Sequence, residues 1–274
     1  YVTMEPCTHY GVTQPCTNVI ERKKIKRVYF AFNDVDARTA NKSKKVLNEA
    51  NVRVYKKKIN NYKNFYQSYF LNKTKDISFI DAKVAVSKDF FTINKKSNRI
   101  TNSLSKKRTH LIRSQYDAIL STSKSINKDD SLLNCRLNGF DNNKPDLIII
   151  DLNLKIKKKL SLFRLSKKRK LLLITSNNHN KKFTFLHRKG VKIVKIKSLS
   201  TKKDFLNLFK ILKKNGYSRI LVESGLSFLN SLLQKKLIFN LYLFKSSNKL
   251  GLNGSNNASI NILKKLKLKK KNRC

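Results

Sequence analysis

Short stretches of alternating apolar and polar residues are separated along the chain by segments of helical period, and this pattern predicts an α/β protein. Near the start, residues 27–33 are expected to form a strand, 42–50 a helix and 52–55 another strand. A strand, helix, strand order favours a parallel sheet. Residues 59–74 are polar and aromatic without a clear period, and we interpret them as the crossing into a second domain.

The rest of the chain has its own alternation of strands and helices. Apolar residues at helical spacing predict amphipathic helices over 203–214 and 226–235. We therefore divide the chain into a first domain, residues 1–74, and a second domain, residues 75–274. Strands of the second domain are expected at 79–86, 117–121, 147–151, 171–175, 192–196, 219–223 and 240–244, with a further strand in the Lys-rich tail from residue 263 onward.

The formal net charge of +46 raises the question of a polyanionic partner. A basic excess favours nucleic acid or an anionic membrane, because neutralising phosphates drives such binding. The lysines are nevertheless spread through every segment, which fits a general enrichment of tolerant surface positions better than a binding patch. Nor does the chain hold an uninterrupted apolar run of about 18 residues, as a transmembrane helix needs. We expect no specific nucleic-acid partner and no membrane partner.

Four cysteines in 274 residues make no disulfide framework, which favours a reducing compartment and a cytoplasmic location. Cys7 and Cys16 each follow a proline in the stretch EPCTHYGVTQPC. Thiolates are good zinc ligands, but a catalytic zinc needs three protein ligands. Zinc nucleobase deaminases take the third ligand from an upstream His-x-Glu motif, whose Glu shuttles protons. That motif is absent here, so the sequence predicts an incomplete zinc site and no catalytic residue.

The long insert between the two cysteines resembles the deaminase domain of the bifunctional deaminase/reductase family of riboflavin biosynthesis, whose loop reads like TLEPCSHYGRTPPC. The resemblance implies that residues 1–74 are the C-terminal part of a cytidine-deaminase-like domain. His9 then lies beside the zinc site and is not the third ligand. Because the chain opens at Tyr1 in the middle of this pattern, we expect an N-terminal truncation and no deamination by this chain.

Three further stretches resemble the reductase domain of the same family, which is similar in fold to dihydrofolate reductase. Residues 83–89 keep the frame of the family motif K-x-A-x-S-L-D-G, although Phe90 replaces its final glycine. The stretch LIRSQYDAILSTSKSINKDDSLLNCR, residues 111–136, resembles LLRAxxDAILVGxxTVxxDDPxLTxR. RILVESGLSFL, residues 219–229, resembles LxVEGGxxLxxxxL. A dihydrofolate-reductase-like domain is therefore expected over 75–274.

The resemblance implies NADPH-dependent reduction of 5-amino-6-(5-phosphoribosylamino)uracil to the ribitylamino product, by a homo-oligomer. Guanidinium groups suit the 5′-phosphate of this phosphoribosylaminopyrimidine, because they bind oxyanions at two points. Backbone N–H groups at a helix start suit the phosphates of the cofactor. By position, the substrate-binding residues are Ser97, Arg113, Leu133, Arg136 and Glu223. The NADPH-binding residues are Ala85, Arg99, Ser125, Asp129, Leu152 and Gly225.

Two alternatives stay open. One is a degenerate, inactive reductase, because Phe90, Arg99 and Leu152 depart from the family pattern at expected contact positions. The other is a basic nucleic-acid-binding relative of tRNA-editing deaminases, which requires a basic face with interleaved aromatic residues. The long cysteine insert and the continuous match to the reductase argue against it. Membrane association through the Lys-rich tail is a minor third possibility.

Overall fold

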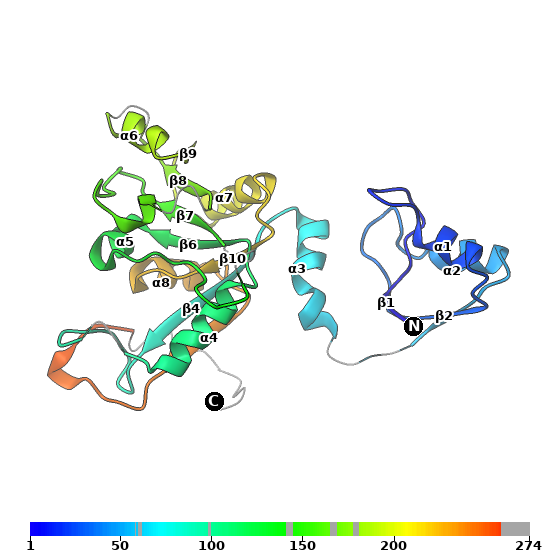
Figure 1. Cartoon of the computed structure of the whole chain (residues 1–274), viewed down its shortest axis with the longest axis horizontal. Coiled ribbons are helices and arrows are strands. Elements are labelled where there is room, and N and C mark those ends of the chain that lie inside the picture. The colour runs from blue at the N-terminus through cyan, green and yellow to red at the C-terminus, as the bar shows by residue number, and fades with distance from the viewer. Residues whose placement is uncertain are drawn as a thin grey trace. The chain divides into compact units, whose positions relative to one another are not determined.

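The structure, a computed structural model, describes residues 1–57, 59, 62–97, 100–140, 145–164, 169–177 and 181–258. The chain divides into two compact units, Tyr1–Ile77 and Ser78–Cys274, here called the N-terminal and C-terminal units (Figure 1). Each unit contains a sheet of parallel strands with helices between them, which confirms the expected α/β fold. None of the helices in the described ranges has the length and apolar character that crossing a membrane demands.

The N-terminal unit contains a three-stranded parallel sheet in the order β1-β2-β3. The small core between sheet and helices consists of Val28, Leu47 and Val52. Its second helix fills the crossover that two parallel strands require. The elements are β1 (Val2–Met4), α1 (Cys16–Arg22), β2 (Arg27–Phe32), α2 (Ser43–Glu49) and β3 (Arg53–Lys56).

Residues 59–74, interpreted from the sequence as the crossing into a second domain, contain most of helix α3 (Tyr62–Lys75), which the sequence pattern did not predict. Contacts with the rest of the N-terminal unit hold this helix. The ring of Tyr66 lies 4.5 Å from that of Phe32, and the hydroxyl of Tyr69 donates a 2.7 Å hydrogen bond to Asp34. Contacts of this kind do not require apolar residues at helical spacing. The sequence pattern therefore did not indicate a helix, because tertiary packing stabilises it.

The C-terminal unit contains a seven-stranded sheet in the order β11-β4-β10-β6-β7-β8-β9, in which all neighbours are parallel. All seven expected strands are confirmed, with bounds that differ by one residue at most. They are β4 (Phe79–Val86), β6 (Ala118–Thr122), β7 (Asp146–Ile150), β8 (Leu171–Thr175), β9 (Val191–Lys195), β10 (Arg219–Val222) and β11 (Leu241–Lys245). A separate antiparallel pair, β5 (Phe91–Asn94) and β12 (Gly254–Asn257), was not expected. The strand expected after residue 263 lies outside the described residues.

Helices cover both faces of this sheet, as the handedness of parallel crossovers requires. Connections that run from β4 toward β9 carry α4, α5 and α6, and the apolar residues of these helices share one core cluster with the sheet. Connections that run back carry α7 and α8, which right-handed crossovers place on the opposite face. The bounds are α4 (Ser103–Arg113), α5 (Ser123–Asp129), α6 (Lys182–Arg188), α7 (Lys202–Lys214) and α8 (Leu226–Gln234), with short 3-10 turns η1 (Ser161–Arg164) and η2 (Gly251–Asn253).

Strand β10 returns between β4 and β6, so the direction of the connections changes at the centre of the sheet (Figure 1). Ligands of open parallel sheets bind at the carboxyl ends of the strands beside such a change. Val222 pairs with Ala82 of β4 and Leu120 of β6. The residue after it, Glu223, therefore lies beside Lys83 and points to the same face of the sheet.

Candidate active site

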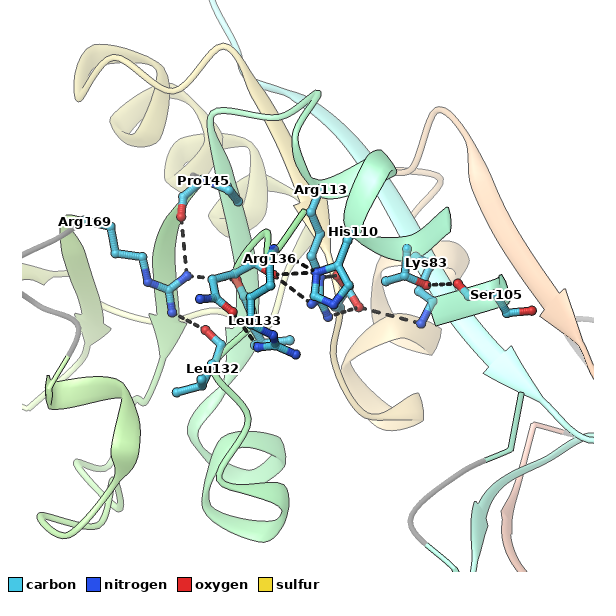
Figure 2. Close-up of polar contacts among 12 residues, drawn as sticks. Lys83, Ser105, His110, Arg113, Leu132, Leu133, Arg136, Pro145 and Arg169 are labelled. Atoms are coloured by element: carbon cyan, nitrogen blue, oxygen red, sulfur yellow. Dashed lines mark hydrogen bonds and ion pairs between the residues drawn. The ribbon is translucent and has the colours of Figure 1, made fainter. Parts of the chain in front are cut away.

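Glu223 and Arg113 form a two-point ion pair at the carboxyl end of β10. The Nε of Arg113 donates to Oε1 of Glu223 at 2.6 Å, and Nη2 donates to Oε2 at 3.0 Å. The Nζ of Lys83 lies 3.7 Å from Oε2. These side chains are only 9% (Glu223), 11% (Arg113) and 15% (Lys83) exposed. Three elements, α4, β4 and the turn after β10, thus bring one carboxylate and two cations together (Figure 2).

The two cations keep Glu223 ionised despite its burial. Burial alone raises the pKa of Glu223, but the charges of Arg113 and Lys83 outweigh it and hold the pKa below its usual range. Burial lowers the pKa of Lys83, and the attraction of Glu223 offsets part of that effect. An ionised carboxylate can only accept hydrogen bonds. Glu223 is therefore suited to receive N–H or O–H groups from a polar ligand.

The loop after α5 joins this ion pair through its backbone. The carbonyl of Asn134 accepts a 3.1 Å hydrogen bond from Nη1 of Arg113. Nδ1 of His110 lies 3.0 Å from the same carbonyl and 3.3 Å from the backbone nitrogen of Arg136. Leu133 is buried in the core, whereas Arg136 is exposed and donates to the side chain of Asn134 at 2.6 Å. Four expected substrate-site residues, namely Arg113, Leu133, Arg136 and Glu223, thus belong to one connected group.

Ser125 and Gly225, expected to contact NADPH, are joined by a hydrogen bond: the N–H of Gly225 donates to Oγ of Ser125 at 2.8 Å. Gly225 is the N-cap of α8 and makes no side-chain cap bond. A Cβ at Gly225 would lie 3.3 Å from that Oγ, which is tighter than ordinary van der Waals contact. Because β6 and β10 are neighbours, the starts of α5 and α8 meet at one edge of the sheet. An uncapped helix start offers free N–H groups to an anion, so these residues fit a cofactor phosphate.

Three of the other expected cofactor-site residues, Ala85, Asp129 and Leu152, belong to β4, to α5 and to the turn after β7. Ala85 lies two residues beyond Lys83 on the same face of β4. Asp129 is the exposed last residue of α5. The carbonyl of Leu152 accepts hydrogen bonds from the hydroxyl of Thr175 at 3.0 Å and the N–H of Ser176 at 3.2 Å. Ser97, expected at the substrate, is exposed and follows β5, while Arg99 lies outside the described residues.

Phe90 occupies the position at which the family pattern has glycine. Its φ of 67° lies in the left-handed region that favours glycine. The chain therefore keeps the turn after β4 although the residue has changed. Lys245 lies 4.2 Å above the ring of Phe90, a contact that glycine cannot make.

Three further residues contact the expected site residues or their loop but were not predicted from the sequence: Lys83, His110 and Arg169. The period of two in the K-x-A-x-S frame could have identified Lys83, because it shares a face with Ala85. His110 lies three residues before Arg113, which places the two side chains on one face of α4. Arg169 lies two residues before the start of β8. No sequence pattern marks it as a site residue, because its contacts depend on the tertiary fold.

The two cysteines of the N-terminal unit lie close together without forming a metal site by themselves. The backbone N–H of Cys16 donates to Sγ of Cys7 at 3.1 Å. His9, expected beside the zinc and not on it, has Nδ1 3.0 Å from Oγ1 of Thr39. Within the described ranges, no group of three or more His, Cys, Asp or Glu side chains could hold a metal ion. These residues therefore do not fit a catalytic zinc without further ligands.

Comparison with known proteins agrees with the arrangement of the C-terminal unit. A family model described as the RibD C-terminal domain matches residues 78–272. The riboflavin biosynthesis protein RibD of Aquifex aeolicus is 29% identical over 253 residues, which cover 89% of this chain and 67% of that protein. A Thermotoga maritima diaminohydroxyphosphoribosylaminopyrimidine deaminase/5-amino-6-(5-phosphoribosylamino)uracil reductase shares the fold, with a TM-score of 0.80 at 21% identity over 96% of this chain and 72% of that one. The riboflavin biosynthesis reductase of Saccharomyces cerevisiae aligns with 72% of this chain and 87% of its own length, with a TM-score of 0.55 at 23% identity.

Proposed function

The chain belongs to the RibD C-terminal domain family of riboflavin biosynthesis, and on that basis we propose that its C-terminal unit is an NADPH-dependent reductase of 5-amino-6-(5-phosphoribosylamino)uracil. The observation that carries this proposal is the ionised Glu223 beside the start of α8. The carboxylate and the N-cap, Gly225, are two residues apart. A group that accepts hydrogen bonds from a polar substrate thus lies next to a helix start suited to a cofactor phosphate.

On the substrate side, we assign different roles to Arg113 and Arg136. Arg113 has five N–H bonds, and those to Glu223 and Asn134 already occupy all three of its nitrogen atoms. We assign two roles to Arg113: it holds Glu223 in place, and its remaining N–H groups donate to the substrate. Arg136 is exposed and bonded only through Nη1 to the side chain of Asn134 among its described side-chain contacts. Its guanidinium is the better candidate for the 5′-phosphate, because its Nε and Nη2 can together bind an oxyanion at two points.

On the cofactor side, the backbone at the start of α8 would hold a phosphate of NADPH, while the hydrogen bond between Ser125 and Gly225 fixes the approach of the two helix starts. Ala85 of β4, Asp129 at the end of α5, Arg99 and Leu152 would complete the cofactor contacts. When bound, NADPH supplies the hydride; the protein supplies orientation and electrostatics. Ser97 and Leu133 would contact the substrate.

For the N-terminal unit we propose the C-terminal part of a cytidine-deaminase-like domain, with Cys7 and Cys16 as two of the three zinc ligands of a full-length protein. Support comes from the cysteine loop and from the fold shared with the Thermotoga maritima protein. Deamination needs the upstream ligand and Glu. We propose further that the protein is a cytoplasmic homo-oligomer, to be checked by light scattering during size-exclusion chromatography.

Purified protein mixed with NADPH and the deaminated pyrimidine tests the reductase. We expect NADPH absorbance to fall only when the pyrimidine is present, and the product to be the ribitylamino compound by mass spectrometry. Glu223→Gln, which removes the charge of the carboxylate, serves as the negative control. A folded protein that leaves NADPH unchanged with the correct pyrimidine would support the degenerate-reductase alternative instead.

A further inference from the structure

Arg169 is a buried guanidinium that contacts the backbone of the substrate-side loop. It is only 8% exposed. Its Nη1 donates to the carbonyl of Leu133 at 2.8 Å and lies 3.4 Å from the carbonyl of Pro145, and its Nη2 donates to the carbonyl of Leu132. Figure 2 shows the guanidinium of Arg169 between the labelled loop residues Leu132 and Leu133 and Pro145.

The conformation of Leu133 explains how one guanidinium reaches two successive carbonyls. In an extended chain, consecutive peptide carbonyls point in opposite directions. Leu133 has a φ of 48°, in the left-handed region that a leucine rarely adopts, and this turn brings its carbonyl to the same side as that of Leu132. Such a conformation persists only where the surroundings hold it. The planar fork of Arg169 supplies two such bonds at once, which a lysine cannot do.

The turn at Leu133 decides where the following residues lie. The next carbonyl, that of Asn134, receives Arg113, and the residue two positions later, Arg136, has its backbone nitrogen beside His110. The loop is therefore held at Leu132 and Leu133 by Arg169, and at Asn134 by the residue that pairs with Glu223. Releasing the first anchor frees the direction of the Arg136 side chain.

Within the described part of the chain Arg169 forms no ion pair, although the charge of Asp146 attracts it. Among the described residues, the ion pairs of the C-terminal unit are those of Glu223 with Lys83 and Arg113. Burial, together with repulsion from Arg113 and Arg136, lowers the pKa of Arg169 to about 10, so it remains charged at neutral pH. Its Nε, also buried, has no hydrogen-bond partner in the described structure. A cation kept in such surroundings favours binding of an anion nearby.

We infer that Arg169 is a positioning residue for the substrate side of the site. It holds the left-handed turn at Leu133, and thereby directs Arg136 toward a phosphorylated ligand without touching that ligand itself. This inference rests on the proposed reductase function for its kinetic consequence. The structural consequence, a loop released when the fork is lost, does not depend on that function.

Arg169→Lys keeps the charge and removes the two-point fork, and Arg188→Lys, an exposed arginine at the end of α6, is the matched control. Hydrogen–deuterium exchange without ligand is the first measurement. In Arg169→Lys we expect at least about tenfold faster exchange of the amides of residues 133–136, because loss of their anchors allows local opening. Amides of β6 and β10 should be unchanged, as should the whole Arg188→Lys protein.

Steady-state kinetics is the second measurement. Arg169→Lys should raise KM for the pyrimidine about tenfold or more, while kcat and the dissociation constant of NADPH stay within about twofold, because binding of a non-reacting phosphate stabilises the ground state and the transition state equally. A general structural role would instead weaken NADPH binding and speed exchange throughout the unit. Unchanged exchange at residues 133–136, or an unchanged KM, would overturn the inference. If the wild-type chain reduces no pyrimidine, the reductase proposal fails, and the exchange result still decides whether Arg169 holds the loop.

Discussion

Arg113 and Glu223 are 110 positions apart in the chain and meet through two parallel hydrogen bonds of 2.6 and 3.0 Å. One residue ends α4 and the other follows β10, so the contact exists only because β10 inserts between β4 and β6. Lys83 supplies a second cation on the neighbouring strand. This cluster of opposite charges is the point from which the proposed substrate and cofactor contacts extend.

Glu223→Gln should lower both stability and activity. The substitution leaves the cations of Arg113 and Lys83 largely buried without their carboxylate, and removing one partner of a buried pair costs about 2–3 kcal/mol where some solvent access remains. Urea unfolding followed by circular dichroism measures this loss. The exposed Glu49→Gln of α2 provides the comparison, and it should leave the midpoint unchanged. Equal midpoints for the two variants would contradict the energetic role given to the pair.

His110 should make stability fall as pH drops below the pKa of histidine in the unfolded chain, about 6.5. Burial lowers the pKa of His110 in the folded protein, so the unfolded chain binds the proton first as pH falls. The contribution of neutral His110 to the unfolding free energy is complete above the pKa of the unfolded state. It is lost as pH falls toward the pKa of His110 in the folded protein. His110→Gln should therefore flatten the curve of unfolding free energy against pH, measured by denaturant titration. His187→Gln, at an exposed position of α6, should keep the wild-type slope; a His110→Gln curve as steep as wild type would argue against this assignment.

Gly225→Ala should weaken NADPH binding through a contact with Ser125. The backbone of Gly225, with φ of −63°, accepts alanine, so the cost comes from the 3.3 Å approach of the new Cβ to the serine Oγ. We expect about a tenfold increase in the dissociation constant, measured by NADPH fluorescence, since about 1.4 kcal/mol corresponds to tenfold. Adding Ser125→Ala removes the crowded oxygen. The effect of Gly225→Ala should then shrink, and strictly additive effects would rule out this coupling.

Glu223 should also govern loss of stability in acid. The pKa of this carboxyl is held below its usual range by Arg113 and Lys83, so its stabilising contribution is complete above the pKa of the unfolded state, about 4.3, and is lost as pH falls through the folded pKa. In acid unfolding monitored by circular dichroism, the stability of Glu223→Gln should depend less on pH over that range than the stability of wild type. A parallel pair of curves would mean that other carboxyls dominate.

A chain of these 274 residues should carry zinc far below one ion per chain after dialysis. Two thiols provide fewer than the three protein ligands of a catalytic site, and the described residues contain no group of three suitable side chains. Atomic absorption on wild type and on Cys7→Ser measures the content, which we expect to be the same in both. One zinc per chain in wild type, lost in Cys7→Ser, would show that this cysteine loop holds the metal without the upstream motif.

The sequence by itself determined the strands of the seven-stranded sheet and the family. Strands of a parallel sheet that is covered on both faces are short, nearly continuous apolar runs, such as residues 147–150 and 171–174, and this signal is local. All seven expected strands of the large sheet were within one residue of their bounds. Motif spacing is local in the same sense. It placed Ser125 and Gly225 among the candidates, and a hydrogen bond joins them.

Only the tertiary structure decided which distant residues meet. Helix α3 has no apolar period in its sequence. Aromatic contacts and the hydrogen bond from Tyr69 to Asp34 hold it instead. Arg169 reaches Leu133 across 36 positions, and no local pattern marks it. The physical reason is that ion pairs and buried hydrogen bonds depend on the order of strands in the sheet, which short-range periodicity does not encode. Sequence thus predicted the elements and many of the candidate residues, while the fold decided how Lys83, Arg113 and Glu223 act together.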